Sequence, residues 1–115
     1  VVGDDKLSTD LRPISEAANK KHTKLELDYK FNDPNDTERI YYRSDHYNFA
    51  RKGVPALFFY DGMLKSDYHK PTDTVDKISW ALYRKRTALI YSLAWELANA
   101  PTMLSRDIPL SSETR

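Results

Sequence analysis

The sequence predicts an α/β fold, in which helices pack against a small number of buried strands. Residues 54–60 form a nearly unbroken apolar run between Gly53 and Asp61, which is typical of a strand buried on both faces. In residues 10–22 and 76–100, apolar side chains recur every three or four positions, as they do in helices with one buried side. We therefore expect two or three strands, mainly one central buried strand, with these two helices flanking them.

Length, charge and composition exclude several classes of protein. The chain has 115 residues, with 18 Lys and Arg, 17 Asp and Glu and a net charge of +1. We therefore expect one domain, with neither nucleic acid nor an anionic membrane as its main partner. No segment reaches the roughly 20 apolar residues that a membrane-spanning helix requires. The absence of cysteine excludes disulfides and thiolate metal sites.

The first third of the chain predicts a strand end, a helix and a second strand. Residues 1–2 are β-branched and run straight into turn formers, which indicates the end of a strand. The polar residues before Leu11 offer N-caps for the helix over residues 10–22. Apolar and charged residues then alternate over residues 25–30, which is the pattern of a half-buried strand.

The middle of the chain contains a polar loop and a short helix. The loop at residues 32–39 has three acidic residues but lacks the glycine and the distal glutamate of a calcium loop, so we interpret it as a solvated turn. Residues 46–50 predict a helical turn that Ser44 or Asp45 caps. Gly53 should end this turn in the left-handed conformation.

The last third of the chain consists of a loop, the long helix and a tail. Residues 61–74 form the loop, and the second half of the helix over 76–100 is apolar on nearly all sides, so we expect it to pack deeply. The tail is polar and without periodicity, and we expect it to be frayed. We divide the chain into a domain at residues 1–104 and a tail at residues 105–115.

One histidine in the long loop is a candidate metal ligand. His69 lies between the buried strand and the long helix, where ligands usually bind in open α/β sheets. A neutral imidazole at such a position can bind Zn²⁺. The residue type and position alone leave open both a metal ligand and an ordinary loop histidine.

Two ordered blocks of sequence resemble a known family. The first is Ser-Asp-His at residues 44–46, followed by Phe49 and by Gly-Val-Pro at residues 53–55. The second contains Phe-Tyr-Asp-Gly at residues 59–62, then Asp-Tyr-His at residues 67–69 and Asp-Thr-x-Asp-Lys-Ile at residues 73–78. Together these blocks resemble the co-catalytic zinc aminopeptidases, whose relatives include glutamate carboxypeptidases, glutaminyl cyclases and a non-enzymatic receptor ectodomain. The resemblance implies the zinc exopeptidase fold, a mixed β-sheet sandwiched by helices.

The resemblance assigns roles to two adjacent residues. His69 is similar to the last ligand of the paired zinc site. Tyr68 resembles the tyrosine whose hydroxyl stabilises the oxyanion of the tetrahedral intermediate, where a neutral donor can lower the barrier by several kcal/mol.

The resemblance also assigns supporting roles to residues around these two. Asp73 and Thr74 are similar to residues that orient the His69 loop and cap the following helix. Ser44 and Asp45 resemble residues that border the substrate cleft, although capping of the short helix explains Asp45 equally well. For His46 we favour support of the cleft wall over metal ligation.

The activity that the resemblance implies is peptide hydrolysis assisted by two zinc ions, in which a metal-bound water attacks the peptide carbonyl and a glutamate takes its proton. The bridging aspartate, the other ligands and the glutamate base have no recognisable motif in this sequence. We therefore expect this chain to be the C-terminal part, less than half, of a larger catalytic domain. Because catalytic zinc needs about three protein ligands, we expect the isolated chain to be inactive and to bind zinc weakly or not at all.

Two further expectations concern partners and location. Strands that lack their neighbours expose a sheet edge, so we expect that homodimers could form by pairing of such edges. The resemblance to exported bacterial members implies a periplasmic or extracellular location.

Three functions remain open at this point. The first is a zinc-dependent exopeptidase, specifically an aminopeptidase acting on peptide substrates. The second is a glutaminyl-cyclase-like zinc acyltransferase, although Tyr68 before His69 favours the peptidase because cyclases tend to carry Trp there. The third is a binding module without catalysis on the same fold, against which the retention of both residues argues.

Overall fold

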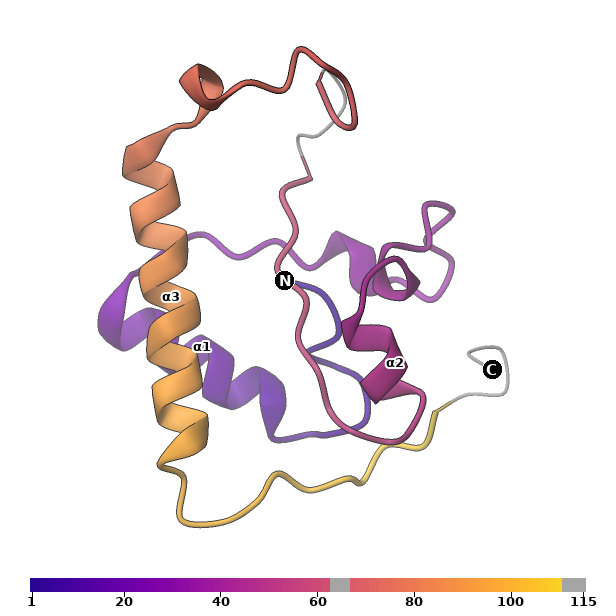
Figure 1. Ribbon diagram of the computed structural model, residues 1–115. Helices are drawn as coiled ribbons and strands as arrows, with labels where there is room; N and C mark the ends of the chain where they lie inside the picture. The colour runs from indigo at the N-terminus through magenta and orange to yellow at the C-terminus, as the bar shows by residue number, and fades with distance from the viewer. Residues whose placement is uncertain (63–66, 111–115) are drawn as a thin grey trace.

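The computed structural model describes residues 1–62 and 67–110. Its helices and 3-10 turns are, in chain order, α1 (Leu11–His22), η1 (Lys30–Asn32), η2 (Ile40–Tyr42), α2 (His46–Ala50), η3 (Val75–Lys77) and α3 (Trp80–Ala98). Figure 1 shows α1 crossing α3 on one side of the molecule, while α2 and the N-terminal residues form the other side.

The helices follow the sequence predictions closely. The helix predicted over residues 10–22 is confirmed as α1, with basic residues in its last turn, where positive charge suits the helix dipole. The short helix is confirmed as α2, and Gly53 follows it with a φ of +79°. The long helix begins later than predicted, because η3 and an extended Ile78 (φ −70°, ψ 123°) precede Trp80.

The predicted sheet is not confirmed. Among the described residues there is no regular strand, and pairing is limited to one antiparallel bridge between Val2 and Phe58. In this bridge each residue donates its N–H to the other's carbonyl at 2.8 Å. Residues 54–60 are half-buried and not buried on both faces, and residues 25–29 form no strand. A strand needs a neighbour for its ladder of hydrogen bonds, and here the neighbour extends no further than Val2.

The loss of the sheet also affects the predicted mode of dimerisation. The described residues contain no sheet edge longer than one bridge, and the formation of homodimers stays a prediction.

An aromatic cluster forms the main core. Its buried members are Val2, Leu7, Ile40, Tyr41 and Ala50. Partly buried side chains surround them, namely Phe31, Tyr42, Tyr47, Phe58, Tyr60 and Leu110. The ring of Tyr41 meets those of Tyr42 and Tyr47 edge to face at 5.4 and 5.8 Å, a geometry that aromatic pairs prefer.

Gly3 allows the N-terminal segment to enter this cluster. Its φ is +89°, and a Cβ atom there would lie 2.7 Å from the carbonyl oxygen of Ala56 and 2.7 Å from the Tyr41 ring. A larger residue would therefore both strain the backbone and collide with the segment that Val2 pairs with.

The helices α1 and α3 pack against each other and form a second packed region, which we call the helix layer. The buried residues of α1 are Leu11, Ser15, Ala18 and Asn19, and those of α3 are Leu89 and Leu93. The deep packing that we predicted for the second half of α3 is wrong, since Tyr91 and Trp95 are exposed. No helix in the described ranges is both long and apolar enough to cross a membrane.

The first part of the tail is held in place, in contrast to the predicted fraying. Asp107 accepts hydrogen bonds from the backbone N–H of Thr9 at 2.9 Å and from its hydroxyl at 2.5 Å. The N–H of Ser105 donates to Asp10 at 2.8 Å, and that of Ile108 to the Leu7 carbonyl at 3.3 Å. Residues 111–115, where we also predicted fraying, lie outside the described residues.

A buried polar cluster joins three segments. The Asp4 carboxylate is fully buried and accepts hydrogen bonds from Arg12 on α1 at 2.7 and 3.2 Å. It also accepts one from the side-chain NH₂ group of Asn32 at 2.6 Å, and the side-chain Oδ1 of Asn32 accepts the Gly3 N–H at 2.7 Å. A buried charge is tolerated only when it is paired and hydrogen-bonded in this way.

We expect Asp4→Ala to lower the free energy of unfolding by about 2 to 3 kcal/mol, because it leaves the buried amide of Asn32 without its acceptor and removes the partner of Arg12. The matched control is Asp5→Ala, whose side chain is 35% exposed and pairs with Lys6 at 3.1 Å, and this change should lower it by less than about 1 kcal/mol. Urea unfolding measures both values. Equal effects of the two substitutions would show that the cluster does not hold the fold together.

Candidate functional site

Tyr68 and His69 form an exposed pair on the loop before α3. Their rings stack with centroids 3.8 Å apart and an interplanar angle of 21°. Tyr68 is 48% exposed, and His69 is exposed as well. The turn is closed by hydrogen bonds from the Lys70 N–H to the Asp67 carbonyl at 2.9 Å and from the Asp73 N–H to the Lys70 carbonyl at 3.1 Å. Both side chains are therefore accessible to a ligand.

The backbone of His69 is strained. Its φ is +57°, in the left-handed region that few non-glycine residues occupy. Such strain costs on the order of 1 kcal/mol or more and concentrates at functional sites. Leu7, Lys24 and Arg39 share this conformation, so the backbone of His69 is consistent with a functional role but does not distinguish it from them.

The loop is tied to the element that follows it. The Lys77 ammonium group in η3 lies 2.9 Å from the Asp67 carboxylate, so the residue before Tyr68 is joined to the approach to α3. In Figure 1 this loop lies at the end of the molecule where α3 begins. Residues 63–66, which complete the predicted loop, lie outside the described residues.

Asp73 and Thr74 lie beside η3 with exposed side chains. The Thr74 carbonyl accepts the Lys77 N–H at 3.1 Å, but no side-chain hydrogen bond caps η3. The Thr74 hydroxyl donates to the Thr72 carbonyl at 3.5 Å. Within the described ranges no hydrogen bond joins either side chain to His69, and their orienting role stays a prediction.

Ser44 and Asp45 lie at the start of α2, with exposed side chains. Their carbonyl groups accept the N–H groups of Tyr47 and Asn48, both at 3.1 Å. The helix begins with these backbone bonds and without a side-chain cap. The prediction that Ser44 or Asp45 caps this helix with its side chain is therefore wrong, and their place at the border of a substrate cleft stays a prediction.

His46 is built into the aromatic cluster. Its Nε2 lies 2.6 Å from the Tyr41 carbonyl oxygen, so Nε2 carries the proton and donates. Its ring stacks on Phe58 at 4.7 Å and 15°, and its Nδ1 is buried without a partner in the described residues. Burial lowers the pKa of the imidazole, and the hydrogen bond to Tyr41 opposes this effect. His46 is thus a packing residue of the aromatic cluster in this structure, and its support of a cleft wall stays a prediction.

The structure does not join the two groups of predicted residues. Among the described residues, no hydrogen bond, ion pair or ring contact links Tyr68 or His69 to the Ser-Asp-His segment at 44–46. Figure 1 shows the loop and α2 in different parts of the molecule.

A metal centre is not complete within the described residues. They contain no group of three or more His, Cys, Asp or Glu side chains that could hold a metal ion. Catalytic zinc needs about three protein ligands. The residues present therefore do not make a zinc site by themselves, and His69 could supply only one ligand to such a site.

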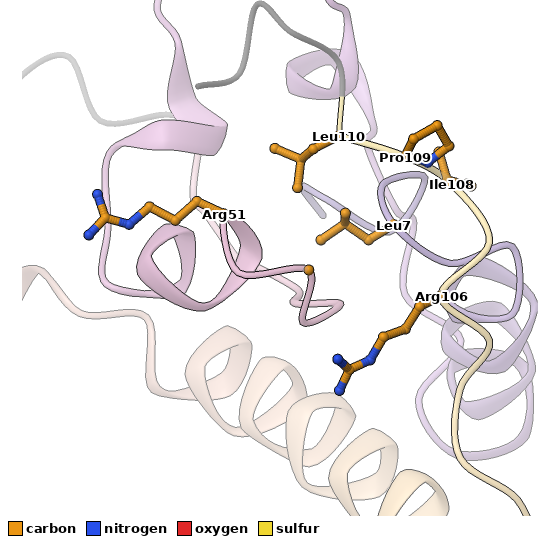
Figure 2. Close-up of a pocket in the computed structure, with 7 residues that line it drawn as sticks. Leu7, Arg51, Arg106, Ile108, Pro109 and Leu110 are labelled. Atoms are coloured by element: carbon orange, nitrogen blue, oxygen red, sulfur yellow. The ribbon is translucent and has the colours of Figure 1, made fainter.

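A pocket is present elsewhere in the described part of the chain. Its volume is about 350 Å³, and Figure 2 shows the residues that line it, which are Leu7, Arg51, Gly53, Arg106, Ile108, Pro109 and Leu110. The Arg51 guanidinium points away from the other labelled side chains. No residue that the sequence proposes for the site lines this pocket, so pocket volume does not identify the candidate site.

Comparison with known proteins places the chain in a class of peptidases. Residues 4–94 match peptidase family M28, and the chain belongs to this family. The match includes both the Ser-Asp-His segment and the Tyr68–His69 loop.

The similar proteins of known name are aminopeptidases. The chain is 36% identical over 90 residues to a probable leucine aminopeptidase of Arthroderma otae, an alignment that covers 75% of this chain and 25% of that protein. It is 34% identical over 84 residues to probable leucine aminopeptidases of Arthroderma benhamiae and Trichophyton verrucosum, covering 70% of this chain and 24% of each relative. The chain thus spans about a quarter of the length of these relatives. No solved structure gives a significant match.

We expect the stability of the chain to fall as the pH is lowered from about 6.5 toward 5, in part through His46. The folded state lowers the pKa of this imidazole, whereas the unfolded chain binds the proton near the ordinary value of about 6.5. The unfolded state therefore binds more protons in this interval, and the stabilisation present above it is lost as the pH falls.

Urea unfolding at several pH values measures this effect. His46→Gln should flatten the pH dependence between pH 5 and 7. An unaltered slope in His46→Gln would refute the assignment.

Proposed function

We propose that this chain is part of a zinc-dependent exopeptidase of the aminopeptidase type, which removes N-terminal residues from peptides by hydrolysis. Membership of peptidase family M28 supports peptidase activity, and the names of the similar proteins support aminopeptidase activity. Because the chain spans about a quarter of those relatives, the activity is proposed for the whole protein to which it belongs.

One observation carries this proposal, namely the exposed Tyr68–His69 pair within the matched residues. The two rings lie together on a strained turn, and both are open to a substrate. A phenol hydroxyl is a neutral donor, so that of Tyr68 can stabilise negative charge on the oxygen of a peptide carbonyl under attack. An imidazole held in one backbone conformation can serve as one metal ligand.

The remaining ligands of the proposed zinc site are expected to come from polypeptide other than the described residues, which contain no acidic or histidine cluster. The isolated chain is therefore expected to be inactive. Zinc, if bound by the whole protein, would supply the Lewis acidity that peptide hydrolysis needs. We also propose that the whole protein is exported to a periplasmic or extracellular location.

The aminopeptidase is favoured over the glutaminyl cyclase and over a binding module. The similar proteins are named as aminopeptidases, and the Tyr68 hydroxyl is exposed beside His69 as hydrolysis would require. The cyclase remains distinguishable because it would convert a peptide with an N-terminal Gln by ring closure and would release no amino acid.

Substitution in the whole protein tests the two roles separately. We expect His69→Ala to abolish release of leucine from a leucyl peptide and to lower the zinc content. Tyr68→Phe should reduce kcat by about 10²- to 10³-fold while leaving the zinc content unchanged. The measurements are amino-acid release and metal analysis of the purified protein.

Exposed residues of the same type serve as controls. His22→Ala and Tyr83→Phe remove an imidazole and a hydroxyl outside the loop and should leave kcat within about twofold, as surface changes usually do. If Tyr68→Phe leaves kcat unchanged, the proposed role of its hydroxyl is wrong.

The isolated chain provides a second test. Because one imidazole is a weak site for zinc, we expect calorimetric titration with zinc to show no saturable binding at micromolar metal, and leucyl peptides to remain intact. Tight binding or turnover by the isolated chain would contradict the incomplete site, and His69→Ala would show whether the binding occurs at this loop.

A further inference from the structure

The tail after α3 crosses the molecule and docks on the residues before α1. Figure 1 shows it running from the end of α3 to the side of the molecule that contains α2. We call residues 105–110 the strap. The strap lies outside residues 4–94, which match the peptidase family, so membership of the family does not explain why this segment is docked.

The strap is fastened mainly by polar contacts. One oxygen of the Asp107 carboxylate accepts the Thr9 N–H at 2.9 Å, and the other accepts the Thr9 hydroxyl at 2.5 Å. The Ile108 N–H donates to the Leu7 carbonyl at 3.3 Å. Among the strap side chains, those of Ile108 and Leu110 are half-buried and the rest are exposed. A segment with exposed hydrogen bonds and few buried apolar contacts opens at a lower free energy than the core.

The remaining contact uses a carboxylate that has an alternative partner. Asp10 is the N-cap residue of α1, yet its side chain makes no capping hydrogen bond and instead accepts the Ser105 N–H at 2.8 Å. An aspartate at an N-cap ordinarily accepts a backbone N–H from the first turn of its helix. When the strap undocks, Asp10 becomes free to accept the Arg12 N–H at the second helical position. The carboxylate thus has a partner in either state, which lowers the cost of undocking.

The strap also forms one wall of the pocket of about 350 Å³. Its residues Arg106, Ile108, Pro109 and Leu110 line this pocket, and Gly53 lies across from them. Figure 2 shows the strap along one side of the pocket and the turn after α2 on the other. The pocket therefore exists only while the strap is docked.

We propose that the strap is a hinged element that undocks from residues 7–10 as one unit, while the aromatic cluster and the helix layer stay folded. The bonds described above join residues 105–108 to residues 7–10, so the loss of one bond loosens the others. Residues 101–104, which connect the strap to α3, lie outside any helix and are mostly exposed, as a hinge requires. This motion does not depend on the proposed peptidase activity.

Hydrogen exchange of individual backbone amides in the 115-residue chain, followed by NMR, tests the motion. The amides of Thr9, Ser105 and Ile108 should share one opening equilibrium and, after correction for intrinsic rates, should exchange at least about tenfold faster than the amide of the buried Leu93 in α3. Equal protection of these amides and Leu93 would show that the strap opens only with global unfolding, and would overturn the proposal.

Two substitutions at one position test whether the strap opens as a unit. Ser105→Pro removes the N–H that Asp10 accepts, whereas the control Ser105→Ala keeps it. Ser105→Pro should speed exchange at Thr9 and Ile108 by at least about tenfold, because a hydrogen bond to a charged group is lost, and should leave Leu93 within about twofold. Ser105→Ala should leave all three rates within about twofold. Unchanged exchange at Thr9 and Ile108 in Ser105→Pro would contradict a single unit.

Asp107→Ala gives an independent test that introduces no proline. It removes both oxygens that Thr9 uses and should speed exchange at Ser105 and Ile108 by at least about tenfold, because the strap opens as a unit. The control Asp76→Ala removes an exposed carboxylate of η3 and should leave these rates within about twofold. If Asp107→Ala speeds exchange at Thr9 alone, the bonds open separately and the strap is not a unit.

Discussion

The carboxylate of Asp4 joins three segments that lie apart in the sequence. It holds Arg12 of α1 at 2.7 Å and the amide of Asn32 at 2.6 Å, and Asn32 in turn holds the backbone of Gly3. The N-terminal residues are thereby fixed between the helix layer and the aromatic cluster. Since a buried carboxylate is strongly unfavourable without such partners, burial of Asp4 requires all three segments to be in place. The adjacent residue Val2 pairs with Phe58 in the one bridge of the described residues.

The consequences of that anchor extend to the aromatic cluster. Val2 brings Phe58 against the ring of His46, and His46 donates to the Tyr41 carbonyl. The segment at residues 54–60 is thus positioned at one point, although it has no second strand beside it. The Tyr68–His69 loop is positioned separately, by the ion pair of Asp67 with Lys77 and by its own turn. The Ser-Asp-His segment at residues 44–46 and the Tyr68–His69 loop, which belong to the same family resemblance, are therefore positioned by different interactions.

Local patterns predicted the helices well and the sheet poorly. The boundaries of α1 and α2 depend on apolar periodicity and on Gly53, which are properties of short segments. A strand at residues 54–60 depends on a neighbour that no local pattern specifies. The Asp4 cluster was not foreseen, because Asp4 lies in a run of turn formers and nothing in its surroundings marks it as buried. The motif located Tyr68 and His69, and the left-handed backbone of His69 is visible only in the structure.

Three features of this chain share one physical character. His69 is a single imidazole, whereas the proposed zinc ion would need about three protein ligands. The apolar segment at residues 54–60 pairs with the rest of the chain through one bridge. The helix α3 exposes large apolar side chains on the side opposite its buried residues. Each is locally well formed, yet each has interactions that its own neighbours leave unsatisfied. The helix layer and the aromatic cluster, by contrast, bury most of their apolar side chains within the chain. The proposed role of His69 therefore depends on ligands from outside the described residues, whereas these two packed regions are held by contacts within the chain.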